Sequence, residues 1–390
     1  MKLALRSLLA SGLLLVGPAL TGGAMLGAQA SDESQDTTAR PSGHFHIGLT
    51  VHDYGISFGN AARVHGIRIN VQDAALERVN GVNLTFWKPR EPISGTINGL
   101  QLGLLPGSQY VNGVALGIGG VVTERRARWI TIGGLGAVSN DALQGVGVGG
   151  LGLVANGSID GIAIGGLGAV SNGDIHGAVI GGLGAVANQD IWGVALGGLG
   201  TVANRSIRGI ALAGLGTVAN EDVTGIAIAG LGTVANRNVT GIAVAGLGTV
   251  TNGDLHGIGA AGLATVADGS LSGFGFGGLA VVTSGRLTGI GIGGLAVVAN
   301  EAISGLSIAG YRVDSPKVSG LNVAGLYLKT RELSGLSVSA YNRVRGLQTG
   351  VAIGIYNSAY VLKGVQIGVL NRAKNNKAPF RMLPILNVHL

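Results

Sequence analysis

Aliphatic, small and turn-forming positions recur every sixteen residues through the middle of the chain. With Gly133 as the first position of the repeat, Leu stands third, Val sixth, an aliphatic residue eleventh and Gly thirteenth. Aliphatic and small residues usually alternate after that Gly, as in Ile162-Ala163-Ile164. Alternation with a period of two is typical of a β-strand. It breaks at the Gly-Gly or Ala-Gly pair that opens each repeat, so we predict a bend there.

Polar residues mark a second corner in each repeat. The eighth position is Asn in nine of eleven consecutive repeats, from Asn140 to Asn300, and a Ser, Asp or Asn often stands two residues later. These residue types form turns readily. Stacked repeats would align the Asn side chains in a hydrogen-bonded ladder. Gly at the thirteenth position fits a third bend, where a Cβ atom would be strained or would crowd the next coil.

A repeat this short cannot bury its apolar side chains alone and must stack on its neighbours. We therefore predict an all-β fold, a parallel β-solenoid of about twenty short coils spaced roughly 4.8 Å apart. The Leu, Val and Ile positions are expected to point inward and form the core. Gly, Ala and Thr are expected to face outward.

The repeat continues in degenerate form on both sides of its regular centre. Equivalent glycines stand at Gly66, Gly81, Gly99 and Gly113, with spacings of 15, 18 and 14, and at Gly320, Gly335, Gly350 and Gly364. These flanks hold most of the aromatic and charged residues, as capping coils should. We predict a single solenoid domain over 44–390, in which N-terminal (44–128) and C-terminal (310–390) capping coils flank a regular core (129–309).

The first thirty residues have the pattern of a secretory signal peptide. Lys2 and Arg6 give a positive start, Leu8 to Leu15 is apolar, and Ala28-Gln29-Ala30 offers a cleavage site. An uncleaved anchor is the alternative, against which Pro18 and the Gly-rich second half argue. We predict a signal peptide at 1–30, a disordered polar linker at 31–43 and an extracytoplasmic location: cell surface, periplasm or secreted.

Composition narrows the class of protein and its partners. The 390 residues include 74 Gly and no Cys, which excludes a disulfide-stapled secreted protein and a Cys-acylated lipoprotein. From Lys317 onward there are ten Lys or Arg and one acid, Glu332. On an exported protein, a basic end favours anionic surface polysaccharide or lipid over nucleic acid as a partner. Solvated turn residues are an equally open interpretation, and the partner itself stays unknown.

Two downstream segments carry a family resemblance. Gly350-Val351-Ala352-Ile353-Gly354-Ile355-Tyr356-Asn357 and Gly364-Val365-Gln366-Ile367-Gly368-Val369-Leu370-Asn371 resemble the Gly-Val-Gln-Ile-Gly-Leu-Ile-Asn blocks of bacterial glycine-rich surface repeat proteins. The resemblance spans roughly Gly66 to the C-terminus and implies an exported protein without a catalytic residue. The centre departs from the pattern, because Gly-Leu-Gly-Thr-Val-Ala-Asn replaces the Gln-containing block there.

Four groups of residues are candidates for chemistry. His44, His46 and His52 could share a strand face as metal ligands, with exposed histidines near the chain start as the alternative. Four acids share the tenth position of the repeat with Ser and Asn, so turn formation explains them: Asp174, Asp190, Asp222 and Asp254. His176 and His256 share one variable site. Five threonines stand sixteen apart and could form an ice-binding face: Thr201, Thr217, Thr233, Thr249 and Thr265.

We predict no catalytic, cofactor-binding or metal site and no enzymatic activity. The leading hypothesis is an exported surface or structural repeat protein that is adhesive or contact-forming through its solenoid walls. The main alternative is a carbohydrate-binding or carbohydrate-active solenoid, which would need acids clustered beside a cleft. Further alternatives are an ice-binding protein and an outer-membrane β-barrel, for which sixteen residues are too few for two spanning strands of about ten residues each.

Overall fold

The computed structural model describes residues 46–389, which belong to two compact units, Met1–Asn204 and Arg205–Leu390. The predicted signal peptide (1–30), the linker (31–43) and His44 lie outside the described residues. The described elements are all strands. No helix in this part of the chain is long and apolar enough to cross a membrane.

The strands of unit 1 run from β1 to β16. They are β1 (His46–Val51), β2 (Tyr54–Gly59), β3 (Arg63–Gln72), β4 (Arg78–Trp87), β5 (Thr96–Gly103), β6 (Gly107–Gly117), β7 (Gly120–Gly133), β8 (Gly136–Ser139), β9 (Ala142–Gly149), β10 (Gly152–Ala155), β11 (Ile159–Gly165), β12 (Gly168–Ser171), β13 (Ile175–Gly181), β14 (Gly184–Ala187), β15 (Ile191–Gly197) and β16 (Gly200–Ala203).

The strands of unit 2 run from β17 to β33. They are β17 (Ile207–Ala213), β18 (Gly216–Ala219), β19 (Val223–Ala229), β20 (Gly232–Ala235), β21 (Val239–Ala245), β22 (Gly248–Thr251), β23 (Leu255–Ala261), β24 (Ala264–Ala267), β25 (Leu271–Gly277), β26 (Ala280–Thr283), β27 (Arg286–Gly293), β28 (Ala296–Ala299), β29 (Ala302–Ala309), β30 (Arg312–Asp314), β31 (Lys317–Thr330), β32 (Glu332–Ala373) and β33 (Met382–His389).

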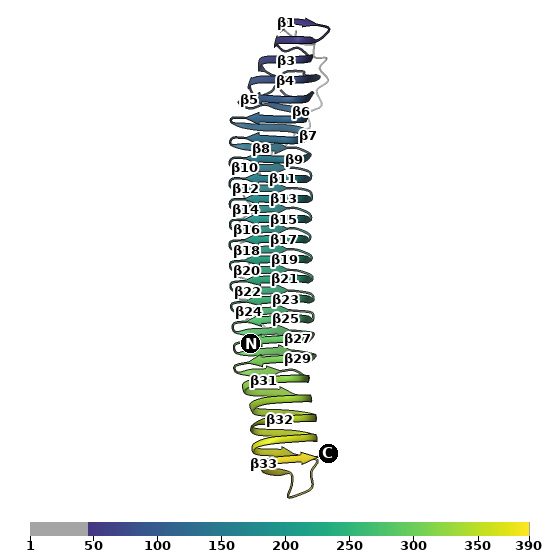
Figure 1. Ribbon diagram of the computed structural model, residues 1–390, viewed down its shortest axis with the longest axis vertical. Coiled ribbons are helices and arrows are strands. Elements are labelled where there is room, and N and C mark those ends of the chain that lie inside the picture. Colours follow the sequence, from purple (N-terminus) through teal and green to yellow (C-terminus); the bar gives the residue numbers. More distant parts are fainter. Residues whose placement is uncertain (1–45, 390) are drawn as a thin grey trace, which may run out of the picture. The chain divides into compact units, whose positions relative to one another are not determined.

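In the regular coils of each unit the strands stack in parallel with a constant register (Figure 1). In unit 1, Gly161 of β11 lies opposite Gly145 of β9 and Gly177 of β13. In unit 2, β21 pairs in the same way with β19 and β23. The predicted parallel β-solenoid with a sixteen-residue repeat is confirmed, with about 18 turns in the described residues.

Each regular coil contains one four-residue strand and one longer strand, as β12 and β13 show. The chain bends at Gly166-Leu167 and again at Asn172, where the repeat predicted corners. The third bend lies inside the longer strand at Gly177, where φ is 128°. A Cβ atom there would collide with the carbonyl oxygen of Gly161. Trp129 occupies the equivalent register position with a φ of 84°.

The expected direction of the side chains was wrong for the Leu and Val columns and for the small residues beside them. The third-position Leu and sixth-position Val point outward: Leu167 is 51% exposed and Val170 is half-buried. The small residues Ala169 and Ser171 point inward instead, while the eleventh-position Ile175 is buried as predicted. Ala, Ser and Thr therefore share the interior with one aliphatic column.

The narrow cross-section of the coil explains this inversion. In unit 1 the larger Leu153 faces inward from the short strand, and the opposite residue is Gly147, where a Cβ atom would meet the Leu153 side chain at 2.6 Å. In unit 2, a Cβ atom at Gly275 would likewise lie 3.2 Å from the side chain of Val281 on the short strand. Interiors pack at the density of organic crystals, so a larger residue on the short strand is matched by Gly, Ala or Ser on the other strand, as Val121 is matched by Ala115.

The threonine column lies in the core, contrary to expectation. Its five members are 0% exposed. Thr233 Oγ1 donates a hydrogen bond to the Val244 carbonyl oxygen at 3.2 Å, and Thr249 donates to Ala260 at 3.1 Å. These threonines join the short strand to the longer strand of the same coil. The hypothesis of an ice-binding Thr face loses its basis, because the face is not at the surface.

The outermost strands of the described residues run antiparallel to their neighbours. β1 forms a hairpin with β2, and β33 returns along the last part of β32. The degenerate coils between them keep the predicted register, with Gly66 opposite Gly81 and Gly81 opposite Gly99.

Candidate functional site

The corner acids hold the backbone of the next coil. Asp174 Oδ1 accepts a hydrogen bond from the Asp190 backbone N–H at 2.9 Å. Asp222 and Asp254 accept from Asn238 N–H at 3.0 Å and Ser270 N–H at 2.6 Å. Because Asn238 does the same for the Asp254 N–H at 2.9 Å, a neutral amide replaces the carboxylate in this role. The position is occupied by side chains that bond to the backbone.

The corner asparagines form the predicted ladder. In unit 1 the Nδ2 of each Asn donates a hydrogen bond to the Oδ1 of the Asn sixteen residues earlier, at 2.7 to 3.1 Å. The ladder runs from Asn204 through Asn188, Asn172 and Asn156 to Asn140. In unit 2 Asn252 and Asn236 donate in the same way. None of these residues is among those with a positive φ in the described part of the chain, so they act through the side-chain bond and not through a left-handed backbone.

The histidines lie apart from one another. His176 Nδ1 is 3.2 Å from Asp160 Oδ1, and its ring stacks on Trp192 with 6.2 Å between centroids. His256 Nε2 lies 4.0 Å from Asp254 Oδ2. His46 begins β1 and His52 follows it. Over residues 46–389 no three His, Asp or Glu side chains gather in a way that could hold a metal ion.

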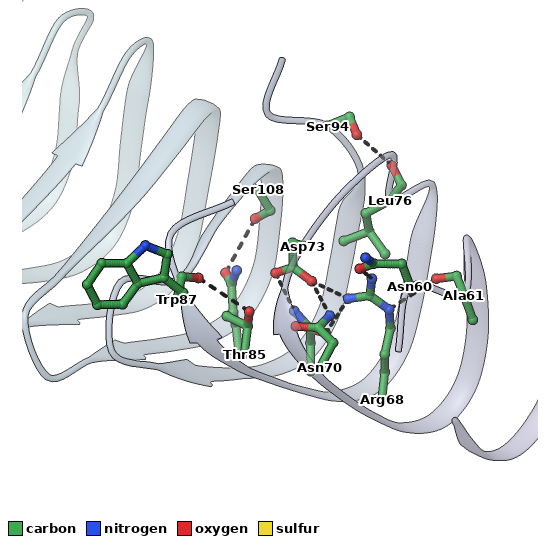
Figure 2. A network of polar contacts seen from close by, with 12 residues as sticks. Asn60, Ala61, Arg68, Asn70, Asp73, Leu76, Thr85, Trp87, Ser94 and Ser108 are labelled. Atoms are coloured by element: carbon green, nitrogen blue, oxygen red, sulfur yellow. Dashed lines mark hydrogen bonds and ion pairs between the residues drawn. The ribbon is translucent and has the colours of Figure 1, made fainter. Parts of the chain in front are cut away.

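A buried polar network occupies the first coils of unit 1 (Figure 2). Arg68 is fully buried and forms an ion pair with Asp73, which lies between β3 and β4. Its other donors reach Ala61 O at 3.0 Å, Asn83 Oδ1 at 2.9 Å and Asn60 Oδ1 at 3.1 Å. Asn70 and Asn83 also donate to Asp73. The whole network faces inward, so its role is to hold these coils together.

The outward face of the longer strands in unit 2 is apolar. We call the part of this face on β19, β21, β23, β25, β27, β29 and β31 the aliphatic wall; it consists of the fourteenth and sixteenth positions of these strands. Its members are Ile226, Ile228, Ile242, Val244, Ile258, Ala260, Phe274, Phe276, Ile290, Ile292, Leu306, Ile308, Leu321 and Val323. The same positions continue on β17 with Ile210 and Leu212 and on β32 with Leu336 and Val338. Ile228, Ile258 and Phe276 are 41%, 40% and 39% exposed. Unit 1 has similar exposed positions at Ile162 and Ile180.

Unit 1 also contains an acidic hollow. It has a volume of about 860 Å³, and its lining is Glu91, Pro92, Ile93, Gln109, Glu124, Arg125, Asn140 and Asp141. Glu124 Oε2 accepts a hydrogen bond from Asn140 at 3.0 Å. Three carboxylates thus lie around one open space. The loop between β4 and β5, where the repeat spacing lengthens to 18, supplies one side of it.

Unit 2 contains a basic hollow near its C-terminal end. Its volume is about 490 Å³, and its lining is Tyr360, Arg372, Lys374, Arg381 and Met382. Lys374 Nζ lies over the Tyr360 ring, 4.1 Å from its centroid. Arg381 Nε donates to the Asn376 carbonyl oxygen at 3.1 Å. The sequence has no Asp or Glu after Glu332, so no carboxylate of this segment neutralises the three cations.

Sequence reasoning predicted neither hollow and placed the third-position Leu and sixth-position Val columns on the wrong side of the strands. The excess of Lys and Arg after Lys317 was the available signal for the basic hollow. For the acidic hollow the signal was the one 18-residue spacing in the flank, because an insertion must leave the coil as a loop. No protein-family model matches the chain, and no curated protein and no solved structure matches it.

Proposed function

We propose that this chain is a non-enzymatic, exported structural protein that forms contacts through the outer face of its solenoid. The observation that carries the proposal is the aliphatic wall: the solenoid fills its interior with small residues and one aliphatic column, and it leaves its other Ile, Leu and Phe columns outside. Contiguous apolar patches above roughly 300–600 Å² are rare on soluble monomers and commonly mark contact surfaces. Export rests on the sequence of residues 1–30 and on the family resemblance.

The regular structure supports a structural role. The recurring acids of the centre bond to the backbone of the next coil, and the recurring amides bond to one another. A catalytic constellation is normally a single arrangement of groups with matched protonation states. The regular coils instead repeat the same polar contacts along each unit.

Attachment of the full chain to surfaces tests the contact function. The chain is compared with Phe276→Glu on films of surface polysaccharide, phospholipid and an apolar polymer, with Val266→Glu on the short strand β24 as a matched control. We expect the wall variant to lose most attachment and the control to keep it. Equal attachment of all three proteins would contradict the proposal. Mass spectrometry of the native N-terminus, expected near Ser31, tests export.

The acidic hollow is the place where an enzyme would contradict this proposal. Glycosidases use a pair of carboxylates flanking one bond, and Glu124 and Asp141 line one space. We expect no release of reducing sugar from a panel of glycans. Hydrolysis that Glu124→Gln removes, with unchanged circular dichroism, would make the chain a carbohydrate-active solenoid instead.

A second candidate function, binding of an anionic glycan or lipid headgroup, is favoured by the basic hollow. Guanidinium groups form paired hydrogen bonds with sulfate, phosphate and carboxylate groups, and an exposed Tyr offers an apolar surface for a sugar ring. Tyr360, Arg372 and Arg381 supply both kinds of group around one space. This candidate does not require the aliphatic wall.

Titration with dextran sulfate and with neutral dextran tests the second candidate. We expect binding of the sulfated polymer only, and about tenfold weaker binding for Arg372→Gln/Arg381→Gln, since two charge-assisted hydrogen bonds are lost. Arg286→Gln, which removes an exposed cation from the regular coils, is the control. Equal affinity in all three proteins would show that the polymer binds elsewhere. Binding of anionic vesicles in place of dextran sulfate would identify lipid as the ligand source.

A further inference from the structure

The aliphatic wall has the dimensions of a protein interface. Seven longer strands contribute to it, and the same positions continue on β17 and on the first part of β32. With strands about 4.8 Å apart, about 3.3 Å per residue and about four residues from the Gly bend to the sixteenth position, these nine strands present on the order of 570 Å². A specific interface needs roughly 1,000 Å² in total, or about 500 Å² on each partner. One wall therefore offers the area of a small specific interface.

The regular spacing of the wall restricts what can fit it along its whole length. Its side chains form two files, each with one member on every strand and therefore with the strand spacing of the sheet. A partner that fills the spaces between these ridges on all seven strands needs ridges of the same spacing. The same wall on another copy of this chain has that spacing, because its strands are stacked in the same way.

The charges of the wall also favour a second copy. The two files contain no charged residue, and the neighbouring twelfth position carries Thr or Ser on six of the seven strands and His256 on the other. Arg208 holds this position on β17, at one end of the wall and away from β25. Two copies can therefore approach without bringing like charges together. An anionic membrane surface would attract cations beside the apolar residues, and the cations of unit 2 concentrate instead after Lys317.

We infer that the aliphatic wall binds the aliphatic wall of a second copy of the chain, in a two-fold symmetric dimer. In a symmetric contact each copy uses the same patch, and opposed sheets pack about 10 Å apart with interleaved side chains. β25 carries the two largest side chains of the wall, Phe274 and Phe276, so we place the two-fold axis near it. Phe274 and Phe276 of one copy then lie against Phe274 and Phe276 of the other.

This inference rests on the proposed contact function and names its partner. The first measurement is the mass of the full chain by sedimentation velocity between about 0.1 and 50 μM, where dimers of moderate affinity form. We expect the mass to rise from that of one chain, 38.7 kDa, to twice that value. Phe276→Glu is expected to weaken the dimer at least tenfold, because two carboxylates would meet at the axis, whereas Val266→Glu keeps it.

A mixture of opposite charges separates self-binding from a general loss of structure. Phe276→Glu and Phe276→Lys are each expected to be monomeric alone and to dimerise when mixed in equal amounts. In addition, Phe276→Cys introduces one thiol into a chain without Cys. A short bis-maleimide should link two such copies, whereas Val266→Cys on the short strand should give no dimer.

A chain that stays monomeric up to 50 μM, or a dimer that Phe276→Glu leaves unchanged, would overturn the inference. Failure of the mixed variants to associate would do the same. These results leave the contact function intact if Phe276→Glu still abolishes attachment in the surface assay, because the wall would then bind another partner. If Phe276→Glu keeps both the dimer and the attachment, both proposals are wrong.

Discussion

The first coils of unit 1 and the last coils of unit 2 both place polar side chains in the interior, but they satisfy them differently. In unit 1 Arg68 and Asp73 form a buried ion pair, with Asn70 and Asn83 as additional partners. In unit 2 Asn342, Asn357 and Asn371 form a neutral ladder, in which each Nδ2 donates to the next Oδ1 at 2.7 Å.

The difference shows what a repeat can and cannot build. The amide ladder uses one residue type at one register position, so it grows by repetition. The ion pair needs Asp73, which stands outside the strands in an irregular segment, and so it occurs once. A buried charge also needs its partner far more than a buried amide does, because the cost of desolvating an unpaired charge is higher. We therefore expect the loss of stability on breaking a polar contact to fall from a buried charge to a buried amide, a buried hydroxyl and an exposed amide.

Replacing Asp73 with Leu should have the largest effect. It leaves the Arg68 guanidinium buried without its counter-charge, which costs about 3–5 kcal/mol in comparable cases. Guanidinium unfolding followed by Trp fluorescence measures this in unit 1, which holds all three tryptophans of the chain, Trp87, Trp129 and Trp192. The double variant Arg68→Met/Asp73→Leu should recover most of the loss. A double variant no more stable than the single one would show that the charge is not the cause.

Replacing Asn357 with Leu should have the next largest effect. Asn371 Oδ1 loses its donor, and Asn342 loses its amide partner in the core, at a cost of about 1–3 kcal/mol. Hydrogen exchange of the peptides of unit 2 measures this locally. Leu328 occupies the same register position one coil before Asn342. Changing all three asparagines to Leu should therefore lower the free energy of unfolding by less per residue than Asn357→Leu alone. A larger cost per residue would mean that the ladder stabilises unit 2 beyond satisfying its own groups.

Replacing Thr249 with Val should destabilise unit 2 by about 1 kcal/mol, the usual net value of one hydrogen bond. The change keeps the shape of the side chain and removes only the bond to the Ala260 carbonyl oxygen. Thr217 offers a matched control in the same file, because its buried Oγ1 has no partner within the described residues. Thr217→Val should be neutral or stabilising. A reversed order of the two variants would contradict the inward placement of these hydroxyls.

Replacing Asn188 with Val should have the smallest effect, about 0.5–1 kcal/mol, since it breaks two amide bonds that water can replace. Asn188 is exposed and donates to Asn172 while it accepts from Asn204. The unfolding midpoint of unit 1, again by Trp fluorescence, tests this. A decrease of more than about 2 kcal/mol in the free energy of unfolding would show that this exposed ladder contributes as much as a buried one. It would contradict the ranking of these contacts by burial.

The repeat made most of the architecture predictable. The strands, both corners, the Gly bend and the sixteen-residue register all follow from positions that are identical in successive repeats. The direction of the side chains did not follow, because Leu167, Val170 and Ala169 are all apolar and hydrophobicity alone does not say which of them faces inward. The size of the interior decides this, and it depends on the distance between the two strands of a coil.

The unique features were out of reach for a related reason. Arg68 and Asp73 meet because an irregular segment folds back into the stack, and the acidic hollow exists because the loop containing Glu91 leaves it. Neither position is constrained by a repeat. A sequence with many copies of one unit describes that unit well and its exceptions poorly.

The constant register of the regular coils has a genetic consequence. Gly161 pairs with Gly177, and Gly225 with Gly241, in the same way at every step. A gene segment of sixteen codons therefore encodes one interchangeable layer. Unequal recombination that adds or removes such a segment would change the number of layers while every remaining hydrogen bond finds an equivalent partner, so length can vary in a lineage without a new fold. Coils of 14 or 15 residues also keep the register, whereas the longer coil between Gly81 and Gly99 carries its extra residues as a loop.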